Sequence, residues 1–191
     1  WQKFSVFNRV GKELGYEVLR LCPQEKYITG ADIYVIDEYR KKFHLGEVLR
    51  LSSIMELLEN GLEAIKIKSK NTAVYFHAKY GFKPDFIEFY TRDKLLSDIL
   101  KDSAFPDFSA RAAGLLRKIS NSAPEGQRDA CREANKLVKD YIERALCAPH
   151  PEKSHPFSFS TDMILTRENV LENRDFFNRC FAKHSIDYKI D

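Results

Sequence analysis

Strand-like and helix-like hydrophobic patterns alternate through residues 4–90 of this 191-residue chain, and this alternation limits the fold more than any other feature. The segments expected to form strands are short apolar or alternating runs at residues 4–7, 16–21, 32–36, 64–68 and 82–90. Helical spacing predicts helices at 47–58 and 71–79. Because a strand–helix–strand succession joins parallel strands through a crossover, we predict an α/β fold: a mixed central sheet flanked by helices.

The second half of the chain is predicted to be mainly α-helical. Apolar residues recur at helical spacing at 94–101, 108–120 and 125–146. A Pro-rich linker at 148–156 follows, and after it we expect a strand within 157–166 and a helix at 168–183. We therefore predict a core at residues 1–92 and, at residues 93–191, a helical module that offers a surface for a protein partner.

Composition excludes several classes of function. The net charge of +3, from 31 basic and 28 acidic residues, argues against a nucleic-acid binder. No apolar run approaches the ~20 residues that span a bilayer, and the N-terminal segment lacks the apolar stretch of a signal peptide. We therefore predict a cytoplasmic protein without a membrane partner. Four dispersed cysteines indicate reduced thiols, and no metal site is predicted because Cys147, His150 and His155 lack a second ligand pair.

A candidate anion site lies where the strand at 32–36 leads into the helix at 47–58. Basic residues follow the strand, and residues 44–46 open the helix. The first turn of a helix presents free backbone N–H groups and a positive dipole end, which favour a phosphate. We predict a pyrophosphate cradle; the alternative is an ordinary β–α junction with a solvated basic loop. The predicted cofactor-binding residues here are Val35, Ile36, Arg40, Lys41, Lys42, Phe43, His44, Leu45, Gly46 and Glu47.

A second motif follows, AVYFHAKYGF at residues 73–82. The residues that match the pattern A-x-x-F-Y-x-K-x-G-F are Ala73, Phe76, Lys79, Gly81 and Phe82. With this motif, residues 4–90 resemble the coenzyme A-binding part of the GNAT (GCN5-related) N-acetyltransferases. Upstream, VIDEYRKK at residues 35–42 resembles the V-x-P-E-Y-R-G-K stretch of that family.

The resemblance implies a GNAT-like mixed sheet with acetyl-CoA as co-substrate, and it adds Asn71 and Phe76 to the cofactor-binding residues. The chain departs from the family in the phosphate loop, where His44 stands at the position of the first glycine when the loop is aligned back from Gly46. The family's fold usually opens with a strand and two helices before the first hairpin. We therefore expect the chain, which begins at Trp1, to be N-terminally incomplete.

The resemblance also implies catalytic roles. In many members of the family a tyrosine protonates the leaving thiolate, and His77 occupies its position, with Tyr75 and Tyr80 as neighbours. Histidine suits a general acid because its unperturbed pKa is about 6.5; a partly buried structural histidine is the alternative. The carboxylates that the resemblance offers as general base are Asp32, Asp37 and Glu38.

Taken together, the motifs predict an acetyl-CoA-dependent N-acetyltransferase that acts on a primary amine of a protein or a small molecule. The altered loop and the absence of the family's tyrosine leave a second hypothesis open. In it, the chain is a catalytically inactive GNAT-like module that senses a ligand or binds a protein. Coenzyme A binding without thioester cleavage would distinguish the second hypothesis from the first.

Overall fold

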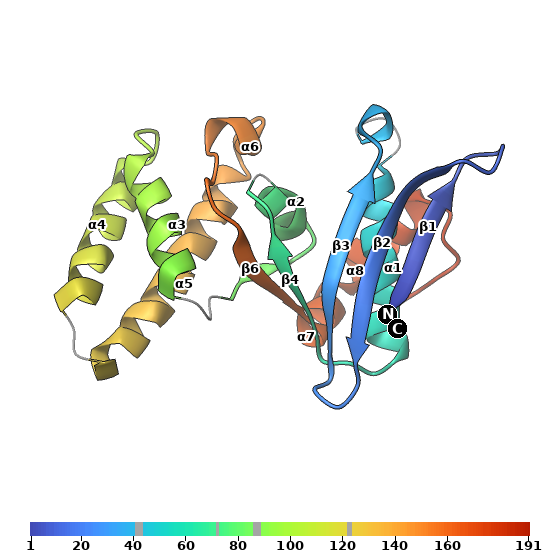
Figure 1. The fold of residues 1–191 in the computed structure, drawn as a ribbon, viewed down its shortest axis with the longest axis horizontal. Helices are drawn as coiled ribbons and strands as arrows, with labels where there is room; N and C mark the ends of the chain where they lie inside the picture. Colours follow the sequence, from blue (N-terminus) through green and yellow to red (C-terminus); the bar gives the residue numbers. More distant parts are fainter. Residues whose placement is uncertain (41–43, 72, 86–88, 122–123) are drawn as a thin grey trace. The chain divides into compact units, whose positions relative to one another are not determined.

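The structure, a computed structural model, describes residues 1–40, 44–71, 73–85, 89–121 and 124–191. The chain forms two compact units (Figure 1). Unit 1 comprises residues 1–67 and 164–191, and unit 2 comprises residues 68–163. The two units are defined by how compactly the chain is folded. The domain ranges predicted from the sequence, 1–92 and 93–191, stay a prediction.

The fold is a mixed sheet flanked by helices, as the sequence predicts. Its strands are β1 (Gln2–Phe7), β2 (Glu13–Cys22), β3 (Tyr27–Val35), β4 (Ala64–Ser69), β5 (Lys83–Pro84) and β6 (Thr161–Thr166). They are hydrogen-bonded in the order β1-β2-β3-β4-β6-β5. β1 and β2 are antiparallel, as are β2 and β3, whereas β3 and β4 are parallel. The predicted strand–helix–strand crossover is therefore confirmed.

The helices are η1, a 3₁₀ turn (Asp37–Tyr39), α1 (Leu45–Glu59), α2 (Ala73–Lys79), α3 (Phe89–Lys101), α4 (Pro106–Asn121), α5 (Pro124–Ala145), α6 (Pro151–Ser154), α7 (Arg167–Glu172) and α8 (Arg174–Lys183). Those predicted at 47–58, 94–101, 108–120 and 125–146 are confirmed to within a few residues, except that α3 begins earlier. In the part of the chain that the structure describes, no helix is long and apolar enough to cross a membrane.

Three predicted elements differ from the structure. The strand predicted at 82–90 is confirmed at Lys83–Pro84, whereas its last two residues, 89 and 90, belong to α3; residues 86–88 lie outside the described residues. The linker at 148–156 contains the single turn α6, which has a proline at its first position. The helix predicted at 168–183 is divided at Asn173, whose side-chain amide donates to the Asn169 carbonyl oxygen at 2.8 Å and competes with the helical ladder.

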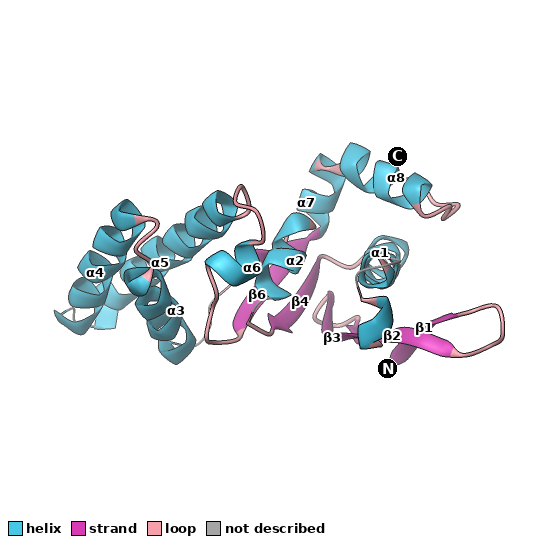
Figure 2. Cartoon of the chain, turned by 90° about the horizontal axis from the view of Figure 1, so that it is seen from above, coloured by secondary structure: helices cyan, strands magenta, loops and turns pink. Residues whose placement is uncertain are grey.

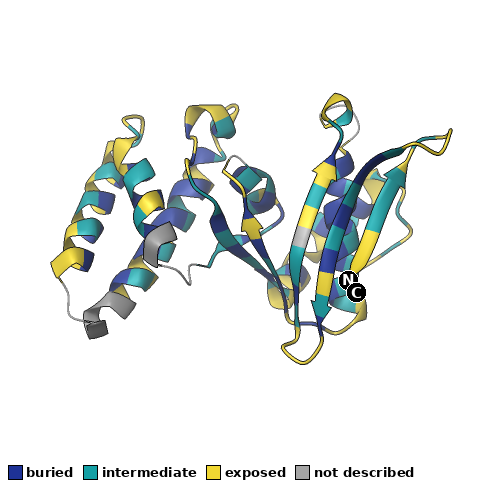
Figure 3. Cartoon of the chain, in the orientation of Figure 1, coloured by how far each residue is buried: buried dark blue, intermediate teal, exposed yellow. Residues whose placement is uncertain are grey.

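In unit 1, α1 packs on one face of β1, β2 and β3, and α7 and α8 lie on the same side (Figure 2). Leu45 and Leu49, one helical turn apart, meet Leu14 of β2 and Val35 of β3 in a buried cluster. β2 is mostly buried, whereas β1 is half-buried or exposed (Figure 3). The C-terminal segment is tied to α8 by the Asn178 side chain, which makes two hydrogen bonds with the backbone of Ile190, at 2.8 and 3.0 Å.

In unit 2, α3, α4 and α5 pack together, and α2 packs against α5 and α6. The segment that carries α6 is fastened to the end of α3. His155 Nδ1 lies 2.6 Å from Asp102 Oδ2, and the Tyr141 hydroxyl donates to the same oxygen at 2.6 Å. The His155 ring also stacks on Phe105, with 4.5 Å between ring centroids. This buried polar network fixes a segment that the sequence predicts only as a linker.

Candidate functional site

The pairing of β3 leaves much of one edge without a partner strand. β3 pairs with β4 at its first two residues, Tyr27 with Ala64 and Ile28 with Ile65. Within the described strands no β3–β4 pair follows these two, although β3 stays paired with β2 as far as Val35. The β4-facing edge of β3 over residues 29–35 therefore offers backbone N–H and C=O groups to a ligand that is extended like a strand.

An irregularity interrupts this edge of β3. Val18 of β2 pairs with Asp32, and Arg20 pairs with Thr29, so β3 spans three residue steps where β2 spans two. The extra residue falls at 30–31, where Gly30 has a φ of +62°. A bulge of this kind changes the direction of backbone N–H groups, and it places Asp32 on the exposed surface beside the edge.

The end of β3 turns sharply into η1. The Arg40 Nε group donates to the Val35 carbonyl oxygen at 3.0 Å and lies 3.0 Å from Asp37 Oδ1. Arg40 is therefore folded back on the strand end. Asp37 and Glu38, the predicted general bases, are both exposed on η1. The predicted phosphate-binding residues Lys41, Lys42 and Phe43 lie outside the described residues.

The first turn of α1 carries a charge cluster centred on a buried carboxylate. Glu47 is 8% exposed, and its carboxylate lies 3.0 Å from Lys183 Nζ and 3.3 Å from His184 Nε2. His44, which precedes the helix in a left-handed conformation (φ +52°), approaches the same carboxylate at 3.7 Å. Burial alone would raise the pKa of Glu47, but the hydrogen bonds and positive charges of Lys183 and His184 outweigh it and hold that pKa below its ordinary value.

Sequence reasoning missed Lys183 and His184. Both stand at the C-terminal end of α8, where basic residues are common because they complement the helix dipole. A basic helix end does not indicate which acidic residue it meets, and Glu47 is 136 residues away in the chain. Of the other predicted cradle residues, Leu45 is buried and Gly46 half-buried at the start of α1, while Val35 is buried and Ile36 half-buried at the end of β3.

The residues of the second motif lie in unit 2. His77 is 8% exposed on α2, and its ring contacts Phe76 and Phe82, with centroid distances of 5.1 and 5.6 Å. Tyr80 is buried and packs on Phe76 at 5.2 Å. Asn71 precedes α2 and is exposed. The structure thus places the motif in one short helix and the turn after it.

Tyr75 has a defined structural contact. Its hydroxyl donates to the His155 carbonyl oxygen at 2.6 Å, and the side chain is 2% exposed. Burial, followed by the negative charge of Asp102, raises the pKa of Tyr75. A hydroxyl whose proton is used in this way, and whose ionised form is disfavoured, is poorly suited to donate a proton to a leaving thiolate.

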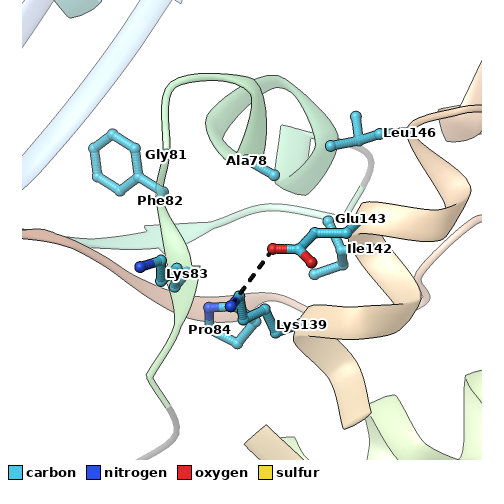
Figure 4. Close-up of a pocket in the computed structure, with 9 residues that line it drawn as sticks. All are labelled: Ala78, Gly81, Phe82, Lys83, Pro84, Lys139, Ile142, Glu143 and Leu146. Atoms are coloured by element: carbon cyan, nitrogen blue, oxygen red, sulfur yellow. Dashed lines mark ion pairs between the residues drawn. The ribbon is translucent and has the colours of Figure 1, made fainter. Parts of the chain in front are cut away.

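A small pocket of about 70 Å³ lies between the α2–β5 connection and α5 (Figure 4). Its apolar lining residues are Ala78, Phe82, Pro84, Ile142 and Leu146, and Gly81, Lys83, Lys139 and Glu143 complete it. Lys139 and Glu143 form an ion pair at 3.6 Å (Figure 4). The pocket has room for a small apolar group beside charged partners. Among the described residues, no group of three or more His, Cys, Asp and Glu side chains is placed to hold a metal ion.

Comparison with known proteins gives a distant structural likeness. No protein-family model and no curated protein matches the chain. The crystal structure of Tetrahymena GCN5 is similar over 45% of this chain and 53% of that chain, with a TM-score of 0.40 and 15% sequence identity. The chain therefore spans about half the length of that structure. A likeness this distant assigns neither an activity nor a ligand.

The predicted site residues fall into two groups. The cradle residues, from Val35 to Glu47, belong to unit 1, and the second-motif residues, from Asn71 to Tyr80, belong to unit 2. In unit 1 the structure brings together the end of β3 and the start of α1. It adds the cations of α8 to them. The catalytic and cofactor-binding roles stay predictions.

Proposed function

We propose that the chain is an acetyl-CoA-dependent N-acetyltransferase that transfers an acetyl group to a primary amine of a protein or a small molecule. The observation that carries the proposal is the edge of β3 over residues 29–35, which extends beyond its two pairs with β4 and ends close to the start of α1. The pantetheine arm of coenzyme A contains two amides, which suit the backbone groups of such an edge. The motif resemblance at residues 35–42 and 73–82 supports the same assignment.

The residues of the chain divide the work of acyl transfer. The exposed carboxylates Asp37 and Glu38 are the candidates to accept a proton from the incoming ammonium. As the amine nitrogen bonds to the carbonyl carbon, backbone N–H groups near the bulge at residues 30–31 are the candidates to stabilise the oxyanion. When the carbon–sulfur bond breaks, the attacking nitrogen gives up its second proton to solvent, and His77 is the candidate to supply the proton that the leaving thiolate takes up. Transfer of the acetyl group to the amine then releases the free thiol.

Thiol release tests this proposal directly. The purified chain is incubated with acetyl-CoA and a panel of amines, namely peptide lysines, peptide N-termini, polyamines and small amines, and free thiol is measured colorimetrically. We expect amine-dependent release, and His77→Ala is expected to lower kcat while the Kd for coenzyme A is unchanged. Release that does not depend on any amine, or normal kinetics in His77→Ala, would contradict the assigned roles.

A glycine substitution tests the cradle separately. Gly46→Trp places a bulky side chain in the first turn of α1 and should abolish acetyl-CoA binding in calorimetric titration. Gly114→Trp is the matched control, because Gly114 is also helical and a side chain there meets open space. Equal affinities in the two variants would remove the cradle from the proposal.

The alternative function, a GNAT-like module that binds a ligand or a protein without catalysis, is favoured by one observation. The Tyr75 hydroxyl is bonded to the His155 backbone inside unit 2, so one of the three candidate proton donors serves packing. This alternative predicts coenzyme A binding without thiol release for any amine.

A further inference from the structure

The cations around Glu47 come from a part of the chain that the cradle motif does not include. Lys183 is the last residue of α8, and His184 caps it. α8 is held in place by Phe177 and Phe181, which are 1% and 0% exposed. The two basic side chains are therefore presented by an anchored helix, and they lie 3.0 and 3.3 Å from the carboxylate of Glu47.

The charge at this place matters because Glu47 lies in the first turn of α1, where a phosphate is predicted to bind. An unneutralised carboxylate here would repel a phosphate and would compete for the positive end of the helix. In the part of the chain that the structure describes, the other titratable groups that face Glu47 are His44 and Cys180. Burial, and then Glu47 itself, raise the pKa of the Cys180 thiol, which stays neutral. Lys183 therefore decides whether the net charge at the first turn of α1 is negative or neutral.

We propose that Lys183 and His184 are positioning residues for the phosphate groups of acetyl-CoA: Lys183 neutralises Glu47, and His184 holds the same carboxylate by a hydrogen bond. The inference rests on the proposed function, since it names residues of the same cofactor site. It makes the C-terminal helix a determinant of cofactor affinity. Removing one compensating unit charge near a surface phosphate site weakens binding by about tenfold.

The test is calorimetric titration of acetyl-CoA into the full chain and its variants. Lys183→Gln should bind about tenfold more weakly, and Glu47→Gln should bind more tightly because it removes the negative charge and leaves Lys183. The double variant, Glu47→Gln with Lys183→Gln, should regain most of the wild-type affinity. Lys189→Gln, an exposed lysine of the same C-terminal segment, is the matched control for the change in net charge.

Recovery in the double variant separates neutralisation from two simpler roles. A direct Lys183–phosphate contact predicts no recovery, and a purely structural role predicts a lower Tm with the Kd unchanged; either result overturns the inference. If Lys183→Gln does not fold, His184→Gln and Glu47→Gln carry the same test. If Lys183→Gln and Lys189→Gln bound acetyl-CoA equally well, the positioning role of Lys183 would also be overturned. The proposed function would not be affected by that result.

Inorganic pyrophosphate distinguishes failure of this inference from failure of the proposed function. If the wild-type chain binds pyrophosphate but not acetyl-CoA, the acetyltransferase assignment fails. The positioning role is then decided by the same variants with pyrophosphate as the probe. If the wild-type chain binds neither ligand, both proposals are overturned.

Discussion

The ion pair between Glu17 and Arg50 gives the sharpest stability prediction. Glu17 of β2 and Arg50 of α1 are both 0% exposed, and Glu17 Oε1 lies 3.0 Å from Arg50 Nη1. Removing one partner of such a pair leaves a buried charge, so Arg50→Met should lower the free energy of unfolding by about 3–5 kcal/mol. Replacing both, Glu17→Leu with Arg50→Met, should restore much of the loss, because well-packed apolar side chains carry no desolvation penalty.

The same pair makes the loss depend on pH. Burial raises the pKa of Glu17 from 4.5 to about 7, against the attraction of Arg50. Because of this raised pKa, the folded state binds a proton at Glu17 more tightly than the unfolded state does. The contribution of Glu17 protonation to stability is therefore complete below pH 4.5 and is lost as pH rises through about 7. At about 1.4 kcal/mol per pKa unit, it amounts to about 3 kcal/mol. In Arg50→Met the attraction is gone and the pKa rises further, so the loss of stability should be larger at pH 8 than at pH 5.

Urea unfolding of the four proteins of the double-mutant cycle measures the coupling. Trp1, the single tryptophan, lies beside Gly30 in unit 1 and is a fluorescence probe of the unit that contains the pair. The exposed pair Lys3–Glu13, at 2.8 Å on the same sheet, is the control, and its coupling should stay below about 1 kcal/mol. A coupling between Glu17 and Arg50 no larger than this control, or a loss that is the same at pH 5 and pH 8, would refute the reasoning.

Three further predictions concern stability. Asn178→Ala removes both hydrogen bonds to the C-terminal backbone and should speed hydrogen exchange in residues 185–191; unchanged exchange would mean that the tail is held by other contacts. Gly30→Ala should lower Tm more than Gly61→Ala, because both have a positive φ but only Gly30 would place a methyl group 3.1 Å from an aromatic ring; equal losses would reduce the effect to backbone strain. Asp102→Asn should lower the free energy of unfolding by about 2 kcal/mol, measured by thermal denaturation. Burial alone would raise the pKa of Asp102, but its hydrogen bonds with Tyr141 and His155 outweigh burial and hold that pKa below 3.8. The contribution of ionised Asp102 to the stability of the wild type is therefore lost as pH falls below 3.8. If Asp102→Asn were as stable as the wild type at pH 7, His155 would be held without this carboxylate.

Local patterns in the sequence predicted most of the secondary structure. The parallel crossover β3–α1–β4 followed from the change in hydrophobic period along residues 32–68, and the helices α3 to α5 followed from their amphipathic spacing. These signals are short-range, because each depends on which face of one element is apolar. The division of the last helix at Asn173 was missed, since it depends on one side-chain amide that competes with the backbone.

Contacts between distant polar residues could not be predicted in the same way. Glu17 reads as an ordinary polar residue in a strand, and nothing near it in sequence indicates that Arg50 meets it in the core. The sequence presents His155 only as half of a metal site, whereas in the structure its ring contacts Asp102, which directly follows α3. In the candidate site, the motif predicts which residues stand at the end of β3 and the start of α1, but the cations that face Glu47 depend on the tertiary fold.

Unit 2 is one uninterrupted stretch of chain, residues 68–163, and it leaves unit 1 in β4 and returns in β6, which are neighbours in the sheet. A stretch that leaves and returns on adjacent strands is an insertion whose two ends are already close together. Within such a stretch, the helices α3 to α5 are free to change in length and sequence over evolution while α1, its charge cluster and the strands beneath it keep their own connections. The part of the chain that diverges fastest among relatives should then be α3 to α5, and the first turn of α1 at Glu47 should be a part that persists.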